Sequence, residues 1–302
     1  MILVSVIEEF LLEQRVRGNS PATLEYYSTV LRFFRDYVGE LVDVNDITLH
    51  QCKQYAVQLQ LSAITSASVQ SYVRGLRAFL RWCYDNDYIE VNICQKFKLP
   101  KATRKVIDVL TDEEVERLFN CFRSPGFLSA RNRLIIALML DSGLRLHEVV
   151  SLTVDSVHLS ERYIIVQRGK GDKQRIVPIG SYTATLLEGY YREISWASCK
   201  PLIIKASDTR IVEPITDTTI KQLFRKLKDR SGIERLHPHL LRHTFATRFL
   251  ENGGNIYTLQ AILGHTSLEM VKRYLHLANS RIRADFTKYS PLDNLGKQKT
   301  AP

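Results

Sequence analysis

The chain has 302 residues, enough for two domains, because a single hydrophobic core rarely exceeds about 250 residues. It carries 42 Lys and Arg against 32 Asp and Glu, and a formal net charge of +10 indicates a polyanionic partner. The five cysteines form no C-x-x-C pair, and no stretch approaches the roughly 18 apolar residues of a membrane span. These features argue against zinc fingers and membrane proteins, so we expect a soluble, cytoplasmic protein.

Residues 1–96 predict a first domain made of helices. Ser20 and Pro21 form a typical helix start, an N-cap serine followed by proline at the first helical position. A further helix is predicted over residues 66–84, with apolar side chains facing inward at Val73, Leu76, Phe79 and Leu80. The same helix carries a basic stripe at positions i, i+3 and i+7, namely Arg74, Arg77 and Arg81. The stripe is a candidate contact to DNA phosphates, and a solvated helix face is the alternative.

Residues 97–107 predict a basic linker that lies along DNA. This segment holds four cations and no acid: Lys98, Lys101, Arg104 and Lys105. Thr111 and Glu114 then form a capping box that begins a new helix. The domain boundary is therefore expected within residues 97–107, with a second domain over 108–293.

The second domain is predicted to mix helices with one hairpin. An apolar helix over 131–139 ends at a glycine turn, and strands over 163–166 and 175–179 flank the glycine-bearing loop 169–173. Later helices are expected near 218–229, 238–252 and 256–263, and a capped helix after them is expected to carry Tyr274. Residues 294–302 are expected to form a loose tail.

Six residues of this domain have side chains suited to attack on a phosphate diester: Arg145, Lys170, His239, Arg242, His265 and Tyr274. Two guanidiniums can hold non-bridging oxygens, a lysine and two histidines can move protons, and a phenol can form a covalent phosphoester. This chemistry requires neither a metal nor a nucleotide, so we expect no cofactor. A free phenol has a pKa near 10, and the neighbouring cations would favour its ionised form.

The order and spacing of these residues resemble those of the tyrosine site-specific recombinases, the phage-integrase family, and within it the Xer-like and mobile-element integrases. The motifs that carry the resemblance are the segment around Arg145, the hairpin lysine, the H-x-x-R box of His239 and Arg242, and His265 nine residues before Tyr274. The resemblance implies a mainly α fold with a small β-sheet (α+β). It also implies an N-terminal helical core-binding (SAM-like) domain and a C-terminal catalytic domain.

The resemblance further implies a role for each residue. Tyr274 would be the nucleophile that forms a 3′-phosphotyrosyl link, Arg145 and Arg242 would hold the phosphate, and Lys170 would act as the general acid. His239 and His265 would assist positioning and proton movement. Glu148 would support Arg145, while Lys173 and Arg175 near the hairpin are expected to contact phosphates.

The expected partner is double-stranded DNA with paired recombination sites, exchanged through a Holliday junction by four protomers. A homotetramer is the simplest assembly; a sister recombinase or an accessory DNA-bending protein remains open. Integration or excision of an element and resolution of chromosome or plasmid dimers are both compatible with the sequence. The apolar segment after Tyr274 is expected to dock on a neighbouring protomer, with folding back on its own domain as the alternative.

Three other classes of function remain open. A type IB topoisomerase-like enzyme would form the same covalent link but relax DNA without exchanging partners. A metal-dependent nuclease is suggested by the histidine cluster His237, His239 and His243, since two histidines four residues apart can share a metal on one helix face. A protein that only binds DNA would form no covalent link.

Overall fold

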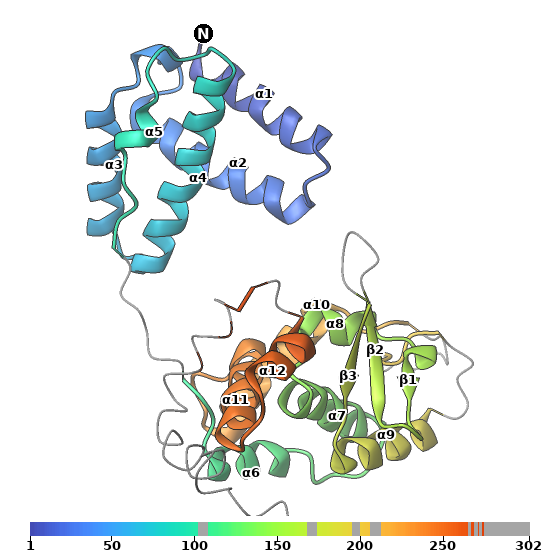
Figure 1. The fold of residues 1–302 in the computed structure, drawn as a ribbon. Helices are drawn as coiled ribbons and strands as arrows, with labels where there is room; N and C mark the ends of the chain where they lie inside the picture. Colours follow the sequence, from blue (N-terminus) through green and yellow to red (C-terminus); the bar gives the residue numbers. More distant parts are fainter. Residues whose placement is uncertain are drawn as a thin grey trace, which may run out of the picture. The chain divides into compact units, whose positions relative to one another are not determined.

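The computed structural model describes residues 1–101, 108–167, 174–194, 200–205 and 213–264, together with 267, 268, 271 and 274. The chain divides into two compact units, Met1–Lys105 and Val106–Pro302 (Figure 1). Most described residues are helical and one small sheet is present, so the predicted α+β class is confirmed. Among the described residues, no helix is long and apolar enough to cross a membrane.

The first unit consists of helices. They are α1 (Leu3–Val16), α2 (Pro21–Val38), the short 3-10 helix η1 (Val44–Asp46), α3 (Leu49–Leu61), α4 (Ser66–Asp85) and α5 (Ile93–Lys96). The predicted start of α2 is confirmed, because the Ser20 side chain accepts a hydrogen bond from the backbone N–H of Thr23. Thr65 caps α4 in the same way through Ser68.

Helix α4 forms one wall of the first unit's core. Its predicted inward residues Val73, Leu76, Phe79 and Leu80 are fully buried. Aromatic rings fill the space between α1 and α4, where Phe10 contacts both Phe79 and Trp82 edge to face. These contacts fix the side of α4 that faces inward, so the basic stripe lies on its outer side.

Phe97 departs from the linker prediction. We placed it at the start of an exposed basic segment, yet it is 2% exposed and belongs to the core of the first unit. The carbonyl of Pro100 also accepts a hydrogen bond from Gln70 on α4. An apolar ring recovers more free energy in a core than in a solvated linker, so the first unit reaches beyond residue 96.

The second unit combines helices with an antiparallel sheet. Its elements are α6 (Asp112–Asn120), α7 (Phe127–Asp141), α8 (Leu146–Ser151), η2 (Val154–Ser156), β1 (Val157–His158), β2 (Tyr163–Gln167), β3 (Gln174–Pro178), α9 (Ser181–Glu193), α10 (Asp217–Ser231), α11 (Pro238–Glu251) and α12 (Ile256–Leu263). Helix α7 packs against both α9 and α11 (Figure 1). Its residues 134–139 are almost completely buried, which explains why this part of the helix has apolar residues on every side.

The sheet has the order β1-β2-β3, and β2 pairs antiparallel with β3, as the predicted hairpin requires, with Ile165 opposite Ile176. Alternate residues point inward: Ile164 and Val166 of β2 are buried, as is Val177 of β3. The hairpin therefore stands with one face on the core. Its tip, residues 168–173, lies outside the described residues.

Among the elements of the second unit that have no counterpart in the sequence prediction are β1 and α9, and α7 begins four residues earlier than expected. Strand β1 spans two residues, too few for any alternating pattern. Helix α9 begins after Gly180, which offers no capping side chain; Asp141, 39 residues earlier, accepts hydrogen bonds from the Gly180 N–H and the Thr183 hydroxyl. The signal that starts α9 is therefore tertiary.

Candidate active site

Arg145 lies at the N-cap of α8, directly after a tight glycine turn. Gly143 has φ +62°, and a Cβ at this position would overlap the ring of Phe245 on α11. Only glycine fits both the backbone conformation and this close approach. The turn thus brings the chain from α7 against α11 and directs Arg145 toward the end of α12.

His239 and Arg242 both come from α11. Pro238 is the first residue of this helix, and His237 caps it by accepting a hydrogen bond from the Leu240 N–H. One helical turn separates His239 from Arg242, so both lie on the same side of α11. The predicted H-x-x-R pair is therefore presented by one rigid helix.

The two predicted phosphate-binding arginines meet at the last carbonyl of α12. Arg145 Nη1 lies 3.2 Å from the Leu263 carbonyl oxygen, and Arg242 Nη2 lies 2.8 Å from the same atom. Arg242 Nη1 also donates to the carbonyl of Gly143. The last carbonyls of a helix have no partner within it and carry partial negative charge, so they hold two guanidiniums side by side.

The two arginines differ in exposure. The Arg145 side chain is 32% exposed, and its Nε and Nη2 have no hydrogen-bond partner among the described residues. Arg242 is only 4% exposed. Burial, followed by the positive charge of Arg145, lowers the pKa of Arg242 to about 10, which still leaves it charged at neutral pH.

His239 lies on the exposed side of the same cluster. Partial desolvation, then the positive charges of Arg242 and Arg145, lowers its pKa from the ordinary value near 6.5. Histidine with a depressed pKa is mostly neutral at physiological pH. It can therefore accept a proton, as the sequence analysis expects.

Glu148 is a buried carboxylate bound by two arginines. Its side chain accepts hydrogen bonds from Arg145 Nη1 at 2.9 Å and from Arg175 Nη1 and Nη2 at 2.8 and 2.9 Å. Burial alone would raise the pKa of the Glu148 carboxyl, but the hydrogen bonds and charge of Arg175, then those of Arg145, lower it to about 2. Glu148 is therefore ionised throughout the physiological pH range.

Arg175 does not fit the phosphate-contact role that we expected. Its side chain is only 9% exposed, and besides the two bonds to Glu148 its Nε donates to the Ile262 carbonyl at 2.7 Å. A bidentate pair with a buried carboxylate directs the guanidinium into the protein. The expected DNA contact rested on the position of Arg175 next to a glycine-rich loop. Its actual partner, Glu148, lies 27 residues earlier in the chain, so the sequence around Arg175 gives no sign of the pair.

Tyr274 lies in a small apolar cluster beside α11 and α12. It is 2% exposed and packs with Ala246, Leu250, Leu259, Leu263 and Val271. Its hydroxyl is 2.7 Å from Nδ1 of His243, the residue that follows Arg242. No contact of this kind was predicted for His243 from the sequence, where the available signal was its position next to the H-x-x-R pair.

The three histidines of the proposed metal cluster have separate tasks. His237 caps α11 through Nδ1, His243 binds the Tyr274 hydroxyl, and the rings of His239 and His243 are 6.5 Å apart between centroids. Within the described parts of the chain, no three His, Cys, Asp or Glu side chains come together as a metal site. The arrangement therefore does not support the metal-dependent nuclease hypothesis.

Several predicted site residues lie outside the described residues: Lys170, Lys173, His265, Arg104 and Lys105. The strands that flank Lys170 and Lys173 are described, as is the end of α12 directly before His265. Of the helix predicted to carry Tyr274, only residues 267, 268, 271 and 274 are described, and the segment that follows Tyr274 lies outside the described residues. The roles of these residues remain predictions.

The predicted DNA contacts of the first unit lie at its surface. Arg74 and Arg81 of α4 are exposed and Arg77 is half-buried, while Lys98 and Lys101 are exposed beyond α5. Arg81 is held by Asp85 one turn later, with Nε 2.8 Å from a carboxylate oxygen. An outward basic stripe is what phosphate contact requires.

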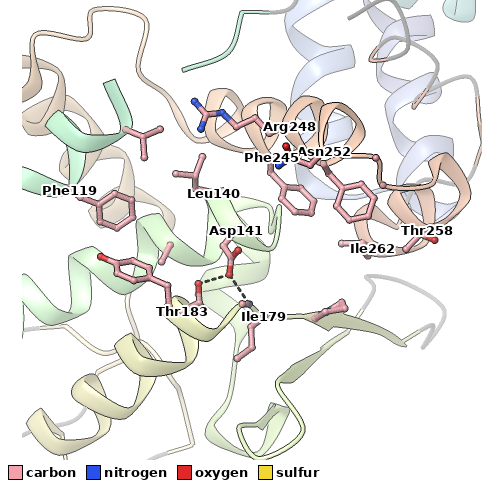
Figure 2. Close-up of a pocket in the computed structure, with 18 residues that line it drawn as sticks. Phe119, Leu140, Asp141, Ile179, Thr183, Phe245, Arg248, Asn252, Thr258 and Ile262 are labelled. Atoms are coloured by element: carbon pink, nitrogen blue, oxygen red, sulfur yellow. Dashed lines mark hydrogen bonds between the residues drawn. The ribbon is translucent and has the colours of Figure 1, made fainter. Parts of the chain in front are cut away.

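The second unit also has a large pocket (Figure 2). It has a volume of about 1020 Å³, and its lining includes Leu140, Ile179, Phe245 and Ile262. Asp141 also lines the pocket, and its carboxylate accepts the two hydrogen bonds from the start of α9 that are described above. None of the predicted catalytic residues lines it, so this pocket does not define the reaction site.

Two family models together match most of the chain. The model of the phage integrase family matches residues 108–281, and that of the phage integrase SAM-like domain matches residues 2–99. The tyrosine recombinase XerA of Thermococcus onnurineus is 32% identical, with 92% of this chain and 93% of the relative covered. The chain is a tyrosine recombinase of the phage integrase family. The predicted resemblance is thereby confirmed.

Solved structures of the family share the fold. The Tn1549 transposon integrase, solved with transposon right end DNA, matches with a TM-score of 0.76 at 20% identity over 96% of this chain and all of that chain. A lambda integrase tetramer bound to a Holliday junction matches with a TM-score of 0.71 at 19% identity, covering 88% of this chain and 78% of the other. The tyrosine recombinase fold thus holds the arginine cluster described above.

Proposed function

We propose that this recombinase exchanges DNA strands at paired sites through a covalent link between Tyr274 and a 3′ phosphate. One arrangement chiefly supports this proposal. Arg145 and Arg242 share the Leu263 carbonyl, and the Tyr274 hydroxyl lies against the residue next to Arg242. Two guanidiniums that meet at one carbonyl suit a transition state whose charge is spread over phosphate oxygens, and the nearby phenol supplies the nucleophile of the proposed step.

The proposed step conserves bonds and protons. The Tyr274 oxygen bonds to phosphorus as the bond from phosphorus to the 5′ oxygen breaks, and His239 accepts the phenolic proton. Lys170 donates a proton to the leaving 5′ oxygen, while His265 assists positioning. The 5′ hydroxyl of a partner strand then attacks the phosphotyrosine and releases the phenol, so the phosphoester bond energy is retained without a nucleotide.

Exchange of two duplexes requires four protomers on two sites and a Holliday junction between two rounds of cleavage. We propose a homotetramer on double-stranded DNA, in which the basic stripe of α4 and the cations beyond α5 contact phosphates of the site. The lambda integrase tetramer on a Holliday junction supports this assembly through its shared fold. A sister recombinase or a DNA-bending protein is an additional partner to be tested by adding it to the purified chain.

A suicide substrate tests the proposed chemistry. Binding sites are first selected from a pool of duplexes, and a nicked version of the selected site is incubated with protein in EDTA and separated on a denaturing gel. We expect a covalent protein–DNA band that is absent from Tyr274→Phe. Cleavage that needs a divalent metal and leaves no covalent band would overturn the proposal.

A further inference from the structure

The carboxylate of Glu148 accepts four hydrogen bonds, two at each oxygen. Oε1 accepts from Arg145 Nη1 and Arg175 Nη1, while Oε2 accepts from the Arg145 backbone N–H and Arg175 Nη2. A carboxylate has about four acceptor positions, so this one is fully used. Glu148 is therefore a junction between the start of α8 and strand β3.

The two arginines bind the Glu148 carboxylate in different ways. Arg175 forms the two-pronged pair and its side chain is 9% exposed, whereas Arg145 forms one side-chain bond and is 32% exposed. Bidentate pairing fixes both the distance and the plane of a guanidinium. Arg175 therefore holds the carboxylate, and the carboxylate directs Arg145, whose remaining donors have no described partner.

Arg175 has a second anchor at the end of α12. Its Nε donates to the Ile262 carbonyl at 2.7 Å, and its side chain lies directly over Gly264. Gly264 has φ +64°, and a Cβ there would lie 3.0 Å from Cδ of Arg175. Glycine is thus favoured both by the left-handed turn and by the close approach of the arginine above it. This turn leads directly to His265 in the sequence.

We propose that Arg175 is a positioning residue for strand cleavage, which acts through Glu148 on Arg145 and through the end of α12 on the turn before His265. This inference rests on the function proposed above. Arg175 lies on β3, which follows residues 168–173 in the sequence. It does not touch the DNA itself.

Loss of Arg175 has a defined electrostatic effect. The charged groups that act on Glu148 are Arg175 from β3, Arg145 at the start of α8 and Arg242 from α11. Without Arg175 the carboxylate keeps its burial but loses two of its four hydrogen bonds. Its pKa then rises, and Arg145 is drawn toward the half-satisfied carboxylate and away from the phosphate.

The first test uses Arg175→Met and Arg175→Lys, with Arg192→Met on the exposed face of α9 as the matched control. We expect Arg175→Met to lower the single-turnover cleavage rate at saturating DNA on the order of 100-fold, since small errors in position cost this much. DNA affinity is expected to stay within about threefold. Arg175→Lys retains the charge but loses the planar, two-pronged donor geometry, and we expect an intermediate rate.

A double-mutant cycle shows whether Arg175 acts through the carboxylate. In a Glu148→Gln background, Arg175→Met is expected to cost clearly less cleavage rate than in the wild-type background, because the route from Arg175 to Arg145 is already broken and only the contact with the end of α12 is left to lose. Equal losses in both backgrounds would overturn the proposal. A loss confined to DNA affinity would also overturn it, since that result describes a phosphate contact. Melting curves of Arg175→Lys separate these results from a general loss of fold.

A titration that needs no cleavage separates this inference from the proposed function. The Glu148 side-chain carboxyl is observed by carbon-13 NMR and assigned with Glu148→Gln. We expect it to stay ionised from pH 7 to 4 in the wild type and to protonate at higher pH in Arg175→Met. If the wild type formed no covalent adduct, the proposed function would fail while this titration still decided whether Arg175 holds Glu148. Identical titrations in both proteins would overturn the inference.

Discussion

The Tyr274 hydroxyl lies 2.7 Å from Nδ1 of His243, one residue after Arg242 on the same helix. The phenol ring itself is held by the apolar cluster of Leu250, Leu259 and Leu263. Tyr274→Phe keeps that ring and removes only the oxygen. We expect complete loss of the covalent adduct, unchanged DNA affinity and a change in unfolding free energy of about 1 kcal/mol. Gel analysis and urea unfolding measure these, and an adduct formed by Tyr274→Phe would exclude Tyr274 as the nucleophile.

Two threonines of α11 allow a matched test of how side-chain hydrogen bonds contribute to the stability of the second unit. The Thr244 hydroxyl accepts from the buried Leu110 N–H and donates to the Leu240 carbonyl. The Thr247 hydroxyl is equally buried and has no partner among the described residues. We expect Thr244→Val to lower the unfolding free energy by about 1–3 kcal/mol and Thr247→Val to be neutral or stabilising. Urea unfolding of both variants provides the comparison; equal effects would contradict it.

Substitution by alanine is expected to have opposite effects on stability at Gly143 and at Gly189. Gly143 has φ +62° and has no space for a methyl group beside Phe245, whereas nothing lies within 4 Å of a Cβ at Gly189 in α9. We expect Gly143→Ala to destabilise the second unit by roughly 2 kcal/mol or more, and Gly189→Ala to stabilise it by about 0.5–1 kcal/mol. Thermal melting measures both, and a stable Gly143→Ala protein would show that the turn can rearrange.

The low pKa of Glu148 predicts how stability depends on pH. Its folded value of about 2 lies below the ordinary 4.5, so its contribution is full above pH 4.5 and is lost as the pH falls toward 2. The linkage amounts to roughly 3 kcal/mol. We expect the stability difference between wild type and Glu148→Gln to be constant from pH 7 to 5 and to shrink below that. Urea midpoints at several pH values measure it, with the exposed Glu188→Gln as control.

Arg81 and Arg17 test whether the stripe of α4 contacts phosphates. Both belong to exposed i,i+4 ion pairs, with side chains 59% and 58% exposed, so their loss affects stability similarly. We expect Arg81→Gln to reduce the slope of log affinity against log salt by about 1, and Arg17→Gln to leave it unchanged. Equal slopes in the two variants would assign the stripe to solvent.

Local signals in the sequence predicted the starts of several helices. Ser20 before Pro21 and the capping box of Thr111 with Glu114 each act within one turn, and the structure has both. Helix α9 was missed because its cap, Asp141, comes from the end of α7. Capping by a distant residue leaves no short-range pattern.

The same distinction holds for the site. Arg145, Arg242 and Tyr274 were named from their family-like order, which records the fold indirectly. Arg175 was misassigned because a cation beside a glycine loop is typical of phosphate binding, while its partner Glu148 lies on another element. His243 was noted beside the H-x-x-R pair and in a metal hypothesis, and its contact with Tyr274 was missed because the two residues are 31 positions apart.

The shared carboxylate of Glu148 also constrains how related chains can diverge. A chain that lost this acid alone would keep two guanidiniums facing each other near the end of α12, and one that lost Arg175 alone would keep a buried, half-satisfied acid. Neither intermediate is favourable, so neither is an easy evolutionary step. We expect residues 148 and 175 to change together across the family. An alignment would then show them as a correlated pair, and this correlation could not be seen from the variation of either position alone.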